Sequence, residues 1–199
     1  MVTAPAPPWL LRGECVAALV RPGLPDPLPT GIERLPGPSL LVAARYDTSP
    51  VGPYLELAVA SPARVGARPG LCVTIMAVDS EQSVLGGRSN WGFPKELASL
   101  SWAANGDERS LAWDDGGMAV TARPRGPAVP VLAPVVCLQP RSDQPVLVPG
   151  WLRGRARWAQ VTVRAGADAG DPLWALAGRH QGLLVTRLRL VVSVPRPVS

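Results

Sequence analysis

The chain has 199 residues, of which 47% are hydrophobic, enough for one domain with a substantial core. The net charge is +5, but the basic residues are scattered and aromatic residues do not interleave with them, which argues against a nucleic-acid platform. A single histidine, His180, excludes a two-histidine zinc site, and no apolar run reaches 18 residues. We therefore expect a soluble cytoplasmic protein that binds no metal, nucleic acid or membrane.

The composition of the chain and the positions of its prolines and glycines predict a loose N-terminal segment followed by one domain. Residues 1–9 are rich in Pro and Ala, and the domain is expected to cover residues 10–199. The Pro-rich stretch 22–38 has no strong periodicity and gives little support for a helix. Continuous apolar runs predict three strands, at 15–20, 40–46 and 71–78.

The segment YLELAVA, residues 54–60, predicts a strand whose two faces differ. Leucine and valine side chains share one face, and Glu56 shares the other with Tyr54 and Ala58. If the first face packs in the core, Glu56 points either to solvent or into a lined cavity. The alternation alone leaves both possibilities open.

A short helix is predicted from about residue 80 to residue 90. It follows Asp79, and Gln82 three residues later resembles a capping box. Lys95 would then lie on a turn that leads to a strand at 100–103.

The second half of the chain indicates β structure. The sequence DDGG between residues 110–113 and 118–122 predicts a hairpin. Residues 129–138 are apolar but interrupted by prolines, which predicts an edge strand or a broken one. Further strands are expected at 157–164 and 183–194. Together the patterns predict a mostly β (α+β) fold, a curled or barrel-like antiparallel β domain with one or two short helices.

Lys95 is the only lysine in the chain, and all other strong bases are arginine. A guanidinium stays protonated at any working pH, whereas an ammonium can lose its proton and attack a carbonyl group. Trp91 and Phe93 place apolar surface beside Lys95, which disfavours the charged form of the amine. The sequence therefore marks Lys95 as a candidate nucleophile, with a surface lysine left by chance as the alternative.

Two segments resemble the acetoacetate decarboxylase family. The first is GRSNWGFPKELA, residues 87–98, which is similar to the family's Schiff-base segment. The second is YDTSPVGPYLE, residues 46–56, which stands in the family's order and at a similar separation. The resemblance covers residues 10–105, and beyond them the β pattern is compatible with the same fold.

The resemblance implies a cofactor-independent lyase. In the family, a neutral lysine attacks the ketone of a β-keto acid, carbon dioxide leaves the iminium, and the enamine is protonated and hydrolysed. Lys95 and Glu56 are then the catalytic candidates, with Glu56 assisting proton transfer. Arg12 or Arg88 would meet the substrate carboxylate, although a surface position for Arg12 is equally expected. The expected partners are a small keto acid and further copies of the chain in a homo-oligomer. The substrate-binding candidates are Arg12, Tyr54, Met76, Arg88, Trp91 and Phe93.

Three positions depart from the family pattern. Glu96 replaces a second lysine after the reactive one, and Leu41 and Ser89 stand where the family has carboxylates. Three function classes therefore remain open. The first is a β-keto acid decarboxylase. The second is an enzyme that uses the enamine as an aldolase, dehydratase or cyclase in specialised metabolism. The third is a catalytically silent binding protein of the same fold.

Overall fold

A computed structural model describes residues 4–21, 28–142, 144–165 and 172–198 of the chain. Within them, the helices are α1 (Glu81–Trp91) and a 3-10 helix over Pro172–Leu176. The strands are β1 (Trp9–Val20), β2 (Glu33–Arg34), β3 (Ser39–Thr48), β4 (Tyr54–Val65), β5 (Arg68–Val78), β6 (Lys95–Leu97), β7 (Leu100–Asn105), β8 (Glu108–Trp113), β9 (Met118–Arg141), β10 (Gln144–Ala165), β11 (Gly178–Val192) and β12 (Arg196–Pro197).

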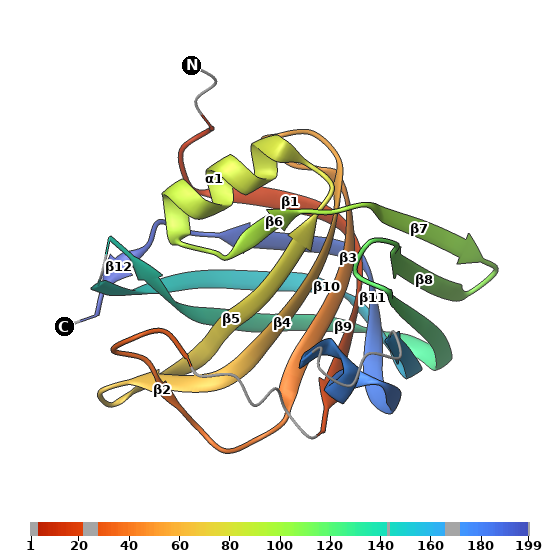
Figure 1. Cartoon of the computed structure of the whole chain (residues 1–199). Coiled ribbons are helices and arrows are strands. Elements are labelled where there is room, and N and C mark those ends of the chain that lie inside the picture. Colours follow the sequence, from red (N-terminus) through yellow and green to blue (C-terminus); the bar gives the residue numbers. More distant parts are fainter. Residues whose placement is uncertain (1–3, 22–27, 143, 166–171, 199) are drawn as a thin grey trace.

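The strands form one curled sheet in the order β12-β10-β11-β1-β3-β4-β5-β9-β8-β7. Strand β9 also pairs with β10, so the sheet turns back on itself, and α1 and β6 lie across one end of it (Figure 1). The predicted mostly β fold with one or two short helices is confirmed. The sheet is mixed, however, because β6 runs parallel to β5 and β9 meets β5 in parallel at the pair of Leu71 and Cys137.

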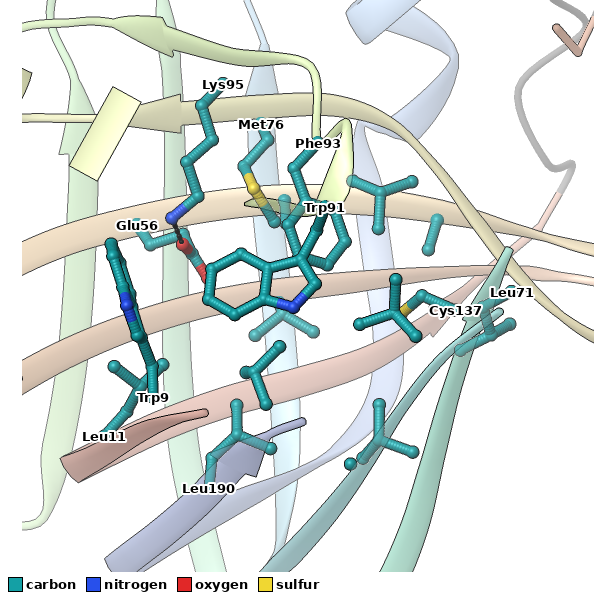
Figure 2. A pocket seen from close by; sticks show the side chains of 18 of the residues that line it. Trp9, Leu11, Glu56, Leu71, Met76, Trp91, Phe93, Lys95, Cys137 and Leu190 are labelled. Carbon is teal, nitrogen blue, oxygen red and sulfur yellow. Dashed lines mark hydrogen bonds and ion pairs between the residues drawn. The ribbon is translucent and has the colours of Figure 1, made fainter. Parts of the chain in front are cut away.

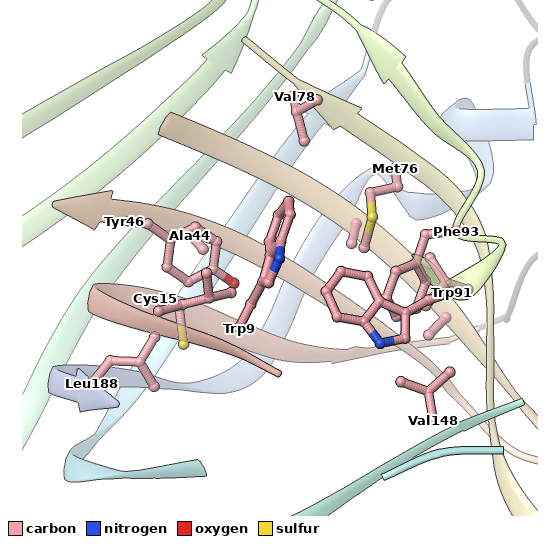
Figure 3. Packing of buried hydrophobic residues seen from close by; sticks show 14 of the residues in the cluster. Trp9, Cys15, Ala44, Tyr46, Met76, Val78, Trp91, Phe93, Val148 and Leu188 are labelled. Atoms are coloured by element: carbon pink, nitrogen blue, oxygen red, sulfur yellow. The ribbon is translucent and has the colours of Figure 1, made fainter. Parts of the chain in front are cut away.

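Each face of the sheet packs against its own apolar cluster. The first cluster lies under α1 and includes Trp9, Met76 and Trp91 (Figure 3). The second lies on the opposite face, where Leu57 of β4 packs with Leu111 of β8. Strand β4 is thus buried on both sides, and its two faces belong to different cores. This burial fixes the direction in which every β4 side chain points.

The prolines at residues 129–138 do not break the strand that contains them. Pro130 and Pro134 lie within β9, which pairs with β10 along nearly its whole length. The other edge of β9 pairs with β8 only at residues 118–122 and with β5 only at Cys137. Between these points the edge is open, so a missing proline N–H interrupts no second ladder. Residues 129–136 of β9 therefore lie on an open strand edge, as predicted, and the strand is continuous through both prolines.

The expected loose segment 1–9 ends earlier than predicted. Trp9 already belongs to β1 and is buried, and its Nε1 donates to the Pro5 carbonyl at 2.9 Å. Asn90 of α1 donates to the same carbonyl at 2.9 Å. Residues 4–9 are therefore tied to the helix, and residues 1–3 lie outside the described part of the chain. The 11-residue α1 and the 3-10 helix are both too short to cross a membrane.

Candidate active site

Helix α1 is held in place at both ends by caps. Ser80, and not Asp79, is the N-cap: its hydroxyl accepts from the Ser83 N–H at 3.2 Å. Asp79 instead accepts from the Leu55 N–H at 2.7 Å, which ties the helix entry to β4. Gly92 ends the helix in the left-handed region at φ 74°, where a Cβ would come within 1.9 Å of the Pro140 carbonyl oxygen. Only glycine fits there, so the turn into β6 is fixed.

Lys95 opens β6 and points back beneath α1. Its Cα is in register with Met76 of β5. A Cβ on Gly87 would lie 2.5 Å from Lys95 Cδ, so the missing side chain of Gly87 leaves the space for the lysine stem. Arg88 Nε donates to the Lys95 carbonyl at 2.7 Å and anchors the backbone of β6. The Gly-Arg pair therefore positions the lysine.

The Lys95 amine is buried among polar partners. The residue is only 4% exposed. Its Nζ lies 2.8 Å from Glu56 Oε2 and donates to Ser83 Oγ at 2.8 Å. The amine also lies 4.9 Å from the ring centroid of Tyr54. Glu56 in turn accepts from the Tyr46 hydroxyl at 3.2 Å.

An apolar cavity of about 140 Å³ extends from this amine (Figure 2). Lys95 and Glu56 meet at one end, and Leu71 and Cys137 lie towards the other. Lys95 and Glu56 are the only charged side chains among the described residues that line it. A dry cavity of about 150 Å³ holds benzene, so the volume suits a ligand body of about six carbon atoms. The lining also includes Trp9, Leu11, Tyr46, Tyr54, Met76, Trp91, Phe93, Val148 and Leu190.

Burial keeps the Cys137 thiol and the two tyrosine hydroxyls of the cavity protonated. Burial raises the pKa of Cys137 to about 12, with the Cys72 and Glu56 charges adding to the shift. Burial likewise raises the pKa of Tyr46 and of Tyr54 well above the usual range, and the Glu56 charge adds to both shifts. The thiol is therefore a poor nucleophile at neutral pH, and Lys95 is the better candidate. No group of three or more His, Cys, Asp or Glu side chains that could hold a metal occurs among the described residues.

Four of the six predicted substrate-binding residues line the cavity: Tyr54, Met76, Trp91 and Phe93. The two arginines do not. Arg12 follows Leu11 in β1, and because side chains alternate along a strand it is exposed on the outer face while Leu11 lines the cavity. Arg88 is exposed and uses its guanidinium on the Lys95 carbonyl. Neither is placed to meet a carboxylate inside the cavity.

The three departures from the family pattern lie away from the amine. Glu96 is exposed on the opposite side of β6, beside Pro94 and Trp113. Leu41 is buried in the second apolar cluster, on the far face of the sheet. Ser89 is exposed and donates to the Leu85 carbonyl within α1 at 2.8 Å.

Sequence reasoning missed Ser83 and Tyr46, both of which contact the pair of Lys95 and Glu56. Ser83 is fully buried on α1. Its place four residues before Gly87, on the helix face that Gly87 opens for the lysine, is the signal that could have found it. Tyr46 is in register with Tyr54 across β3 and β4, a pairing that a hairpin closed by residues 49–53 could have suggested.

Comparisons with known proteins relate this chain to one family. The family model for acetoacetate decarboxylase matches residues 16–126, which is more than half of the chain. An acetoacetate decarboxylase from Burkholderia multivorans is 32% identical over 80 residues, covering 40% of this chain and 32% of that protein. A Burkholderia lata acetoacetate decarboxylase matches with the same identity and coverage. The match thus spans about a third of the length of these curated relatives.

Two solved structures share the fold. The crystal structure of acetoacetate decarboxylase from Legionella pneumophila has a TM-score of 0.70 at 20% identity and covers 100% of this chain and 90% of its own. The enduracididine biosynthesis enzyme MppR, complexed with pyruvate, has a TM-score of 0.71 at 18% identity and covers 100% of this chain and 92% of its own. With the family model matching more than half of its length, this chain belongs to the acetoacetate decarboxylase family.

Proposed function

We propose that the protein is a Schiff-base enzyme that decarboxylates a β-keto acid with a short apolar tail. The observation that carries the proposal is the buried contact of the only lysine with Glu56 at the head of an apolar cavity. A lysine placed there has a proton acceptor at 2.8 Å and space for a carbonyl compound on its other side.

The first steps follow from these contacts. Glu56 takes a proton from Lys95, and the neutral amine attacks the substrate ketone, forming the C–N bond as the C=O π bond breaks. Glu56 then gives this proton to the hydroxyl of the addition product, which leaves as water and gives the cationic iminium. The C–C bond to the carboxylate then breaks, its electron pair moves toward the iminium nitrogen, and carbon dioxide leaves an enamine.

The apolar lining supports loss of the carboxylate. No arginine lies among the described residues that line the cavity, so the only cation available to a bound carboxylate is Lys95 itself. An anion held among apolar side chains is poorly solvated, and decarboxylation removes its charge. An enzyme that keeps the carboxylate through an aldol step needs an anchor for it, and the lining offers none.

A second candidate function is enamine chemistry without loss of carbon dioxide. Glu56 is the only carboxylate among the described residues that line the cavity, and it could serve other reactions of the enamine as well as decarboxylation. A solved neighbour, MppR, is complexed in another crystal with the condensation product of pyruvate and imidazole 4-carboxaldehyde. An aldolase, dehydratase or cyclase acting through Lys95 is the matching alternative for this chain.

The Schiff base is tested by trapping. The protein is incubated with acetoacetate, pyruvate and longer 3-keto acids, sodium borohydride is added, and the intact mass is measured. Since Lys95 is the only lysine, the Lys95→Arg variant is a matched control that keeps the charge and leaves only the N-terminal amine. We expect one adduct in the wild type and none in the variant. An equal adduct in both, or no adduct with any keto acid, would contradict the proposal.

Product analysis on the same panel separates the candidates. Release of carbon dioxide with a ketone one carbon shorter supports decarboxylation. Coupled, dehydrated or cyclised products without release support the second candidate. Binding of the keto acids without adduct or turnover supports a silent binding protein. The homo-oligomer remains a prediction, and light scattering at several protein concentrations measures it.

A further inference from the structure

The Lys95 amine has polar partners on two sides, and only one of them is a carboxylate. Glu56 occupies one side, with Oε2 on the amine and Oε1 on the Tyr46 hydroxyl. Ser83 of α1 occupies another, with its hydroxyl 2.8 Å from Nζ. Glu56 gives the proton that it takes from the amine to the hydroxyl that leaves as water, so it is ionised again when the enamine forms. A later proton transfer to the substrate carbon needs a second group.

The direction of the hydrogen bonds shows which group is free. An ammonium only donates, so Ser83 accepts from Lys95 and keeps its own proton for another partner. Tyr54 faces the same amine, with its ring centroid 4.9 Å from Nζ. The pKa of Tyr54 is raised by burial and by the Glu56 charge and is lowered by a side-chain hydrogen bond with Ser83, and a hydrogen bond that lowers the pKa of a phenol is one that its oxygen accepts. With Ser83 donating to its oxygen, Tyr54 keeps its own O–H for a group in the cavity that it lines.

We propose that Tyr54 is the acid that protonates the enamine carbon and that Ser83 is a positioning residue that holds Tyr54 and Lys95 together during this step. The proposal rests on the proposed Schiff-base function and adds a second route for protons, through Tyr54. The Tyr54 ring centroid lies 4.9 Å from Nζ, so the enamine carbon, which is two bonds from that nitrogen, forms near the Tyr54 side chain.

The step balances without any further reactant. The Tyr54 O–H bond breaks, a C–H bond forms with the enamine π pair, and the iminium is restored. Its positive charge beside the ring offsets the charge on the transient phenolate. The phenolate regains a proton from solvent, which is the one proton that decarboxylation consumes overall. Water then hydrolyses the iminium to the ketone and the Lys95 ammonium.

The two positions where the family has further carboxylates do not reach this cavity. Leu41 lies on the far face of the sheet and Ser89 lies on the exposed side of α1, so neither position could have supplied an acid to this cavity. Among the described residues, the cavity's other hydroxyl belongs to Tyr46 and is committed to Glu56. Its remaining acid, the Cys137 thiol, lies towards the other end (Figure 2).

Hydrogen–deuterium exchange on a simple ketone tests proton transfer from Tyr54 separately from decarboxylation. 2-Pentanone is incubated with the enzyme in D₂O, and loss of its α-proton signals is followed by NMR, because each enamine protonation introduces deuterium. Borohydride trapping with the same ketone is measured in parallel. Exchange reports the protonation step, and trapping reports the Schiff base.

Three variants give the comparison: Tyr54→Phe, Ser83→Ala and, as the matched control, Ser89→Ala on the exposed side of the same helix. We expect exchange to fall by about 100-fold or more in Tyr54→Phe and about tenfold in Ser83→Ala, and in both variants by a larger factor than trapping falls. Ser89→Ala should match wild type in both assays.

The two levels of the proposal fail in different ways. Unchanged exchange in Tyr54→Phe, with trapping intact, overturns the role of Tyr54 and leaves the Schiff base standing. Absence of trapping in the wild type overturns the Schiff base and, with it, the role of Tyr54. If Tyr54→Phe does not fold, the Ser83→Ala variant tests the proposal, because unchanged exchange in that variant contradicts the role of the contact between Ser83 and Tyr54.

Discussion

A single methyl group added at Gly87 should lower the reactivity of Lys95 while leaving the lysine side chain itself unchanged. In Gly87→Ala the new Cβ would lie 2.5 Å from Lys95 Cδ and 2.7 Å from its Cε. Carbon atoms pack at about 3.5–4.0 Å, so the lysine stem must move by about 1 Å. The 2.8 Å contacts of Nζ with Glu56 and Ser83 then lengthen to about 3.8 Å, beyond hydrogen-bond range.

The expected loss is in reactivity more than in stability. A displacement of about 1 Å at a reacting group costs about 100-fold in rate. Alanine is favoured over glycine in a helix by about 1 kcal/mol, and overpacking costs about 1–3 kcal/mol, so the free energy of unfolding should fall by about 0–2 kcal/mol.

The assay is the rate of borohydride-dependent labelling by acetoacetate, with urea unfolding of the same samples. Ser89→Ala on the same helix is the control for a neutral change at the surface of α1. A folded Gly87→Ala protein that labels within threefold of the wild-type rate would show that Lys95 does not depend on this space, and the reasoning would be wrong.

Three further predictions concern the charged and ionisable residues. Burial raises the pKa of Cys15 from its ordinary value of 9.0 to about 12 and that of Cys72 to about 11, so above pH 9 the unfolded chain binds fewer protons than the folded one. The free energy of unfolding should therefore be unaffected by these thiols below pH 9 and fall above it, by about 1.4 kcal/mol per pH unit for each thiol, as urea unfolding at pH 8–11 will measure. Glu56→Gln should slow labelling of Lys95 by about 100-fold or more, whereas Glu96→Gln, on the outer side of β6, should leave its rate and pH profile unchanged; a shifted profile would mean that Glu96 reaches the amine. Arg12→Gln should leave KM for acetoacetate within twofold of wild type, because Arg12 lies outside the cavity, and a large rise in KM would restore it to the site.

The reactive lysine was predictable because its signals are local. Lys95 is unique in the chain, and the glycine and aromatic residues before it specify a helix end and an apolar wall. The sequence left open whether Glu56 faces solvent or a cavity, because alternation shows only which residues share a face of the strand. The structure places it at 2.8 Å from the lysine because β4 is covered on both sides.

The sequence could not decide whether the two arginines reach the cavity, for a physical reason. A guanidinium is equally compatible with a wet face and with an anion site, and sequence alone does not show which face of β1 Arg12 occupies. Both partners of β1 shift register around Gly13, one residue away. Ser83 was missed because a serine near a helix start suggests capping, and its contact with Lys95 depends on a fold that brings β6 beneath the helix.

The ion pair in the cavity has a consequence for affinity. Because Lys95 and Glu56 offset each other's charge, the resting cavity offers an incoming anion little net attraction, and binding must come from burying the ligand's tail. Each buried methylene contributes about 0.8 kcal/mol, or about fourfold in Kd. In a homologous series the affinity should therefore climb steadily with chain length and level off once about six carbon atoms fill the space. The chain length at which the affinity levels off therefore measures the length of the apolar tail that the natural substrate carries.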